Sequence, residues 1–189
     1  MIKYTLRLIL IISLGLIITC IVYTTLHEIG HVLTAYALGV EIKELRLIHP
    51  AYVMVNQIGL SREQFILIGI SGNIFPTITI FSILLVEKLT KDSKIWNILE
   101  IWYSKTFLLF SCTLSYILSI INIVIYIITR RQLEEDISMI INKYPESIGC
   151  VVVLMGLLGL MCTIIFIKQK PITTFINYLE EIYDRSIKE

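Results

Sequence analysis

Two histidines and a glutamate lie within five residues of one another in the stretch His27-Glu28-Ile29-Gly30-His31. Residues four positions apart share a face of an α-helix, so His27 and His31 can offer their imidazoles to one metal ion. Glu28 is placed beside them, where its carboxylate can take a proton from a metal-bound water. This H-E-x-x-H spacing predicts a catalytic zinc site, with His27 and His31 as metal ligands and Glu28 as the catalytic acid and base.

The motif lies in an apolar stretch, residues 4–38, of a chain in which 56% of the 189 residues are hydrophobic and 16% are charged. Soluble domains carry more charge than this, so the composition predicts an integral membrane protein. The apolar run continues through the motif without a cleavage site of small residues, so we interpret it as a retained helix. Ionisable residues inside a membrane segment are costly, and they are functional candidates by default.

Four apolar stretches of suitable length predict membrane crossings, and they cover residues 4–38, 65–86, 106–128 and 148–167. The first is long enough for one tilted helix that ends near Gly39 as a C-cap. Between the first two crossings, residues 40–63 alternate in part and contain β-prone residues, which predicts a short β-hairpin or an extended strand. This segment could cover the site, pair with an extended peptide by strand addition, or simply connect two helices.

Residues 132–144 and 171–189 carry apolar side chains at helical spacing, which predicts amphipathic helices at the membrane interface. The predicted fold is therefore that of an all-α integral membrane protein. It has about four transmembrane helices, a short β-hairpin after the first of them, and amphipathic interfacial helices. The four cysteines lie in apolar stretches, which favours packed thiols over a disulfide framework.

Catalytic zinc normally has three protein ligands and one position left for water, so a third side chain must reach the depth of His27 and His31. We predict that this ligand is Asp136, which follows the third crossing at a point where Ile137 is expected to face the membrane. The alternatives to Asp136 are Glu135, Glu134 and His49.

The second crossing contains Ser71-Gly72-Asn73 and, three residues later, Pro76. An amide, a pair of small residues and a proline inside a membrane helix indicate close packing and a polar task. Asn73 could hydrogen-bond an oxyanion or hold the backbone of a bound peptide. The structural alternative is that Gly72 is a helix-contact residue and Asn73 makes a hydrogen bond between helices.

Taken together, these residues resemble the site-2 protease family of intramembrane zinc metalloproteases, and the resemblance covers roughly residues 20–140. It implies a catalytic core with three transmembrane helices in residues 1–147, to which residues 148–189 add a fourth helix and an amphipathic tail. By position, His27 and His31 match the zinc ligands, Glu28 the catalytic acid and base, and Asn73 the asparagine of the second helix. The implied reaction is the cleavage of a membrane-anchored substrate in or near its transmembrane segment.

The family's Asn-x-x-Pro…Asp-Gly element is present only in part. Asn122 is followed by Ile-Val-Ile without a proline, and Asp136 is followed by isoleucine in place of glycine. A second hypothesis follows from this departure: the chain is a catalytically silent relative that acts as a binding or chaperone-like membrane protein.

The net charge of +1 and the absence of a basic run give no reason to expect nucleic acid as a partner. The expected partners are the lipid bilayer and a membrane-anchored protein or peptide, and the sequence does not define an oligomeric state. The positive-inside rule favours a cytosolic N-terminus, because that side would hold ten of the 16 Lys and Arg residues. The family precedent gives the opposite orientation. We follow the family and expect a multi-pass protein of a prokaryotic cell membrane, with its active site toward the cytosolic side.

Overall fold

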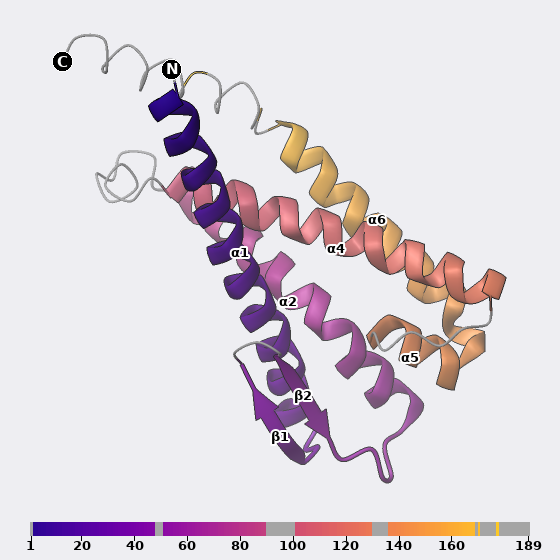
Figure 1. Cartoon of the computed structure of the whole chain (residues 1–189). Coiled ribbons are helices and arrows are strands. Elements are labelled where there is room, and N and C mark those ends of the chain that lie inside the picture. Colours follow the sequence, from indigo (N-terminus) through magenta and orange to yellow (C-terminus); the bar gives the residue numbers. More distant parts are fainter. Residues whose placement is uncertain are drawn as a thin grey trace.

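The computed structural model describes residues 2–47, 51–89, 101–129 and 136–168, together with Lys170 and Asn177. Figure 1 shows the elements in these ranges, which are α1 (Ile2–Ala37), β1 (Ile42–Arg46), β2 (Tyr52–Val55), α2 (Arg62–Leu89), α4 (Ile101–Thr129), α5 (Asp136–Lys143), the 3-10 turn η1 (Pro145–Ser147) and α6 (Ile148–Lys168). The predicted fold class is confirmed, because the protein is mostly helical and a two-stranded hairpin follows its first helix.

Four helices of the described part are long and apolar enough to cross a membrane. The candidate spans are Ile12–Ala37 in α1, Arg62–Val86 in α2, Thr106–Thr129 in α4, and Pro145–Lys168, which joins η1 to α6. All four coincide with predicted crossings. The chain is therefore compatible with a multi-pass membrane protein.

Helix α1 ends where the sequence predicts, at a glycine. Gly39 has a φ of +68°, which is the left-handed conformation that glycine adopts without steric cost. The N–H of Val40 donates to the carbonyl of Ala35 at 2.9 Å, and the N–H of Gly39 donates to that of Tyr36 at 3.1 Å. This pair of bonds is a Schellman cap, which satisfies carbonyl groups that the end of the helix would leave free. The H-E-x-x-H motif consequently lies in the last turns of α1.

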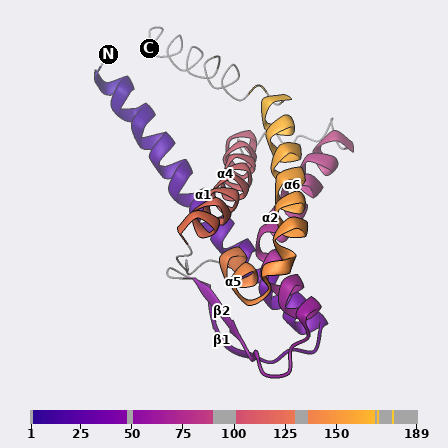
Figure 2. The same ribbon diagram turned by 90° about the vertical axis from the view of Figure 1, so that its right-hand side faces the viewer.

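The two halves of α1 have different surroundings. Its C-terminal half packs against α2, while its N-terminal half diverges from the other helices (Figure 2). The diverging half is apolar, and no other part of the described protein covers its side chains, as is typical of a surface that faces lipid. Its exposed residues include Leu6, Ile9, Leu10, Leu14 and Ile17. The predicted site residues of α1 therefore lie in the half that has protein neighbours.

Strands β1 and β2 form an antiparallel hairpin, in which Leu45 pairs with Val53 and Arg46 with Tyr52. The register shifts between Ile42 and Glu44. Strand β2 contacts α1, so the hairpin lies beside the helix that carries the histidines. The predicted short hairpin is confirmed.

The apolar core of the bundle combines residues from α2, α4, α5 and α6, among them Ile80, Leu109, Tyr116, Ile140 and Met155. Helix α6 packs against α4 and shares this core.

Helix α5 corrects one prediction. Ile137 is fully buried in the protein together with Ile140 and Ile141, so the expectation that Ile137 faces the membrane is wrong. The apolar side of α5 packs against α2 and α4, which present an apolar surface at this end of the bundle. Helix α5, and not lipid, covers that surface. The predicted amphipathic segment 171–189 lies outside the described residues except for Asn177.

Candidate metal centre

The two histidines of α1 point to the same spot. Their Nε2 atoms are 3.1 Å apart, and the rings lie nearly perpendicular, with centroids 4.8 Å apart and an interplanar angle of 82°. The i, i+4 spacing within a regular helix places them on one face, as the sequence predicts.

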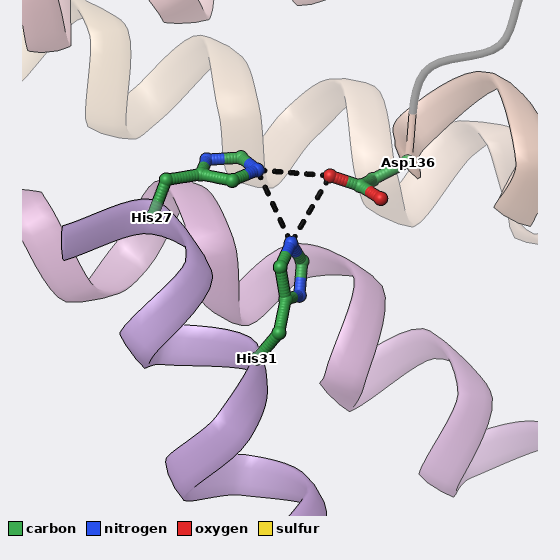
Figure 3. A group of neighbouring side chains, drawn as sticks. All are labelled: His27, His31 and Asp136. Carbon is green, nitrogen blue, oxygen red and sulfur yellow. Dashed lines mark hydrogen bonds and ion pairs between the residues drawn. The ribbon is translucent and has the colours of Figure 1, made fainter. Parts of the chain in front are cut away.

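Asp136 meets both histidines, although it lies more than 100 residues further along the chain. Its Oδ2 atom is 2.9 Å from His27 Nε2 and 3.1 Å from His31 Nε2 (Figure 3). Asp136 is the first residue of α5, so the docking of this short helix on α2 and α4 brings the carboxylate to the imidazoles. Two imidazoles and one carboxylate form a group that could hold a metal ion.

A hydrogen bond to the backbone selects the tautomer of His31. Its Nδ1 atom donates to the carbonyl oxygen of Ile68 in α2 at 2.6 Å. In the neutral imidazole the proton is then on Nδ1, and Nε2 presents its lone pair to Asp136 and His27. Lone pairs that face one another at this distance repel, unless a proton or a metal ion lies among them.

The three ligand-atom separations are a few tenths of an ångström shorter than those around a bound metal ion. Ligand atoms about 2.1 Å from a four-coordinate ion lie roughly 3.4 Å from one another, and the three separations here are 2.9, 3.1 and 3.1 Å. In the chemistry of their donor atoms, the residues present fit a divalent cation that accepts nitrogen and oxygen ligands.

His27 is held differently from His31. Its Nδ1 atom is buried and has no hydrogen-bond partner in the described part of the chain. Its neighbours are the ring of Tyr23, 6.1 Å away between centroids, and the backbone of Gly72. Packing therefore holds the Nδ1 side of this imidazole, while its Nε2 atom contacts Asp136.

The carboxyl group of Asp136 is kept in its anionic form. Burial by itself raises the pKa of this group, but the contacts of the carboxylate with the imidazoles of His27 and His31 outweigh burial and hold the pKa well below its usual range.

Gly72 makes room for the centre. A Cβ atom at this position would lie 2.5 Å from His31 Nε2 and 2.6 Å from His27 Nε2, so any side chain would occupy the space where the ligand atoms meet. Gly30 has a similar role between the helices, because its Cβ would lie 2.5 Å from the carbonyl oxygen of Ser71. The sequence marks Gly72 only as a contact between helices. That the contact is made with the imidazoles follows from the crossing of α1 and α2.

Glu28 lies in the same cavity as the metal ligands. Its side chain is largely buried, with the residue only 9% exposed, and Val53 in β2 lines the same cavity. The hairpin therefore covers the residue predicted as the acid and base.

Asn73 joins three helices. Its Oδ1 atom accepts hydrogen bonds from Tyr23 of α1 at 3.1 Å and from Ser115 of α4 at 2.8 Å, and its backbone carbonyl accepts one from Tyr116 at 3.0 Å. The residue is 3% exposed and lines the cavity. The hydrogen bonds between helices that the sequence offered as an alternative are thus present. With its oxygen used in this way, the side chain has its amide N–H groups left to donate.

Pro76 is accommodated within α2 close to these residues. It has no N–H group, so the carbonyl of Gly72, four residues earlier, loses its usual helical donor. The next carbonyl, that of Asn73, is 3.0 Å from the hydroxyl oxygens of both Thr77 and Tyr116.

A cavity of about 1130 Å³ surrounds the centre and is bounded by α1, β2, α2, α4 and α5. His27, Glu28, His31, Asn73 and Asp136 all line it. Its walls also include apolar side chains from the two helices that flank it, namely Leu16, Phe110, Leu114 and Leu118. The structure thus brings every predicted site residue to one partly apolar cavity.

The alternatives to Asp136 as third ligand, which are Glu134, Glu135 and His49, lie outside the described residues. Comparison with known proteins gives no match: no protein-family model, no curated protein and no solved structure corresponds to this chain. Functional conclusions therefore rest on the residues of the site and on the resemblance of their motifs.

Proposed function

We propose that the chain is an intramembrane zinc metalloendopeptidase of the site-2 protease type. It would hydrolyse a peptide bond in or near the transmembrane segment of a membrane-anchored protein or peptide. The observation that carries this proposal is the convergence of His27, His31 and Asp136 within about 3 Å of one another, beside Glu28, in a bundle of apolar helices.

Zinc is the metal that best suits two imidazoles and one carboxylate in a catalytic site with an open position. His27, His31 and Asp136 would hold it, and Gly72 leaves the space that it needs. When bound, zinc makes a water nucleophilic at neutral pH and polarises the scissile carbonyl.

Glu28 moves the protons in this proposal. Its carboxylate accepts a proton from the attacking water and delivers it to the nitrogen of the leaving amine. Glu28 and Val53 of β2 both line the cavity, so the carboxylate lies beside the proposed metal. Asn73 donates its amide N–H to the carbonyl oxygen of the substrate, on which negative charge develops, and its bonds to Tyr23 and Ser115 fix the direction of that donor.

The cavity suits an apolar peptide in an extended conformation. A helical peptide hides its backbone, so the substrate must unwind before water can reach a carbonyl carbon. Residues 51–55 all line the cavity, which places the edge of β2 that is not paired with β1 along it. An unwound segment can pair with this edge by strand addition, and this favours a binding role for the hairpin over that of a plain connection.

The proposed location is a prokaryotic cell membrane, with the site toward the cytosolic side. This location is what the family resemblance implies. The position of the site in the last turns of α1, near one end of the span Ile12–Ala37, supports a site close to one membrane face. Water and the extended peptide can reach such a site from that membrane face.

The test separates the protease from the silent relative. We expect Glu28→Gln to retain about one zinc per chain and to lose cleavage of tagged single-span proteins reconstituted with it in liposomes, by at least roughly 10³-fold. Glu63→Gln, at an exposed glutamate outside the cavity, is the matched control and should cleave like the wild type. Cleavage by Glu28→Gln at the wild-type rate would refute the proteolytic mechanism, and zinc binding without any cleavage by the wild type would favour the silent relative.

A further inference from the structure

We propose that Gly69 of α2 and Ile140 of α5 form the contact that sets the position of Asp136, so that both act as positioning residues for the metal centre. The inference rests on the proposed function, because it assumes that Asp136 is a metal ligand. It assigns a task to two residues that carry no ligand atom.

The need for such a contact follows from how the ligands are supplied. His27 and His31 belong to one helix of 36 residues, so the regular geometry of α1 fixes their separation. Asp136 is the first residue of α5, which has only eight residues. The distance from its Oδ2 to the imidazoles therefore depends on how α5 is seated on its neighbours.

Ile140 is the residue best placed to seat α5. It follows Asp136 by four positions and so lies one turn further along the same face of the helix. It is fully buried. A Cβ atom at Gly69 would lie 2.6 Å from its Cδ1 and 2.9 Å from its Cγ1, which means that the isoleucine rests directly on the backbone of α2. The same Cβ would lie 3.9 Å from the backbone oxygen of Asp136.

Helix α2 also contacts the C-terminal end of α5. The ring of Phe65 meets that of Tyr144 edge to face, with centroids 5.7 Å apart, and Lys143 Nζ lies 4.1 Å from the centroid of Phe65. With one contact at the middle of α5 and another at its C-terminal end, a shift of α5 along α2 would disturb both of them.

The two glycines of α2 then act as a pair. Gly72 admits the imidazoles from α1, and Gly69, three residues earlier and on the same side of α2, admits Ile140 from α5. One face of α2 thereby determines how closely the ligand-bearing helices α1 and α5 approach the metal centre. Ordinary carbon contacts are about 3.5–4.0 Å, so a methyl group at Gly69 would force the end of the Ile140 side chain, or the helix that carries it, to shift by roughly an ångström. Metal–ligand distances tolerate only about 0.2 Å.

The experiment is a cycle of variants in the full chain purified in detergent: Gly69→Ala, Ile140→Ala and the double variant. Zinc affinity is measured by competition with a chelator, and the visible absorption of bound Co²⁺ reports the ligand set. We expect Gly69→Ala to weaken zinc binding by about 10–100-fold, as loss of ligand support does elsewhere. The double variant should recover to about the affinity of Ile140→Ala, because alanine at 140 lacks the two atoms that a Cβ at 69 would meet.

The matched control is Gly156→Ala in α6, where an added Cβ meets no atom within 4 Å. It should bind zinc like the wild type. Helical content and thermal unfolding are recorded for every variant, because a purely structural role for Gly69 would change these two properties and not the Co²⁺ spectrum of the folded fraction.

Three results would overturn the positioning role. The first is Gly69→Ala with wild-type zinc affinity and spectrum, and the second is a Gly69→Ala defect that Ile140→Ala does not relieve. The third result applies if Gly69→Ala does not fold: it is a wild-type zinc affinity in Ile140→Ala, which is then the only variant that tests the contact. If the wild type binds zinc and cleaves substrate, and Gly69→Ala does so equally well, only the positioning role is refuted. If the wild type binds no zinc, the proposed function and this inference are refuted together.

Discussion

The α1–α2 interface and the α4–α6 interface are both made by helices of membrane-spanning length, but they are filled differently. The first contains buried polar groups, His31 and Asn73, and a glycine, Gly30, that allows the backbones to approach. The second is largely apolar, with Met155 and Cys162 buried against α4. Packing alone is enough to join two helices in a membrane. The polar side chains of the first interface therefore indicate a task other than holding the bundle together.

Hydrogen bonds stabilise the buried polar groups His31 and Asn73 of the polar interface. His31 donates to a backbone carbonyl of α2, and Asn73 accepts from hydroxyl groups on two other helices. One of the few polar groups between α4 and its neighbours is the hydroxyl of Tyr116, which reaches Thr77 at 2.7 Å and so also serves α2. Helix α4 thus contacts α6 through apolar side chains and α2 through this hydroxyl group. Substitutions can therefore be made in the α4–α6 interface without touching the polar groups between α1 and α2.

The largest difference between the two interfaces should appear in the zinc affinity of Gly72→Ala. Its Cβ would lie 2.5 Å from His31 Nε2, so we expect zinc affinity to fall by at least about 100-fold. Gly156→Ala in α6 adds the same methyl group to open space and should leave zinc unchanged. Metal analysis of the purified chains measures both. A Gly72→Ala variant that retains zinc at the wild-type affinity would show that the two glycines are equivalent and that our account of the site is wrong.

The opposite pattern, a loss of stability without a loss of zinc, is expected from Met155→Ala. This side chain is fully buried in the apolar core, and its truncation should lower the free energy of unfolding by about 2 kcal/mol through lost contacts and a cavity. The zinc content of the folded chain should stay at the wild-type value, because Met155 does not line the cavity of the metal centre. Thermal unfolding in detergent and metal analysis check the two halves of this prediction. Loss of zinc from folded chains would mean that the interfaces cannot be separated.

The smallest effect is expected from Tyr23→Phe. It removes one of the two donors to the Oδ1 of Asn73 and leaves the ring in place, so the free energy of unfolding should fall by only about 0.6 kcal/mol, a typical value for a hydrogen bond between membrane helices. Catalysis should respond more than stability, because the remaining bond from Ser115 orients the amide less well. The measurements are unfolding and the cleavage rate at saturating substrate. An unchanged cleavage rate would argue that Asn73 acts only as a tie between helices.

Several features follow from the sequence because they depend on neighbours along the chain. Apolar runs of sufficient length define the four crossings, and Gly39 ends α1 where only a glycine closes the helix easily. The i, i+4 spacing places His27 and His31 on one face of α1. The β-prone residues around Pro50 indicate a hairpin, which is present between Ile42–Arg46 and Tyr52–Val55.

Other features depend on contacts between distant segments. The sequence gives α5 an apolar face, but lipid and protein are equally apolar covers for it, and only the packing of α2 and α4 buries Ile137. The same docking brings Asp136 to the imidazoles across more than 100 residues. Gly69 and Gly72 look alike in the sequence, and only the helices that cross them give each its different neighbour.

The sequence by itself therefore determined the membrane helices, the hairpin and the histidine pair, since hydrophobic length, capping and helical periodicity are local properties. The tertiary structure decided how the centre is completed. It selected the face that α5 buries, the depth of Asp136, and the use of the Asn73 oxygen to join three helices, because each of these depends on which surfaces meet when the helices pack.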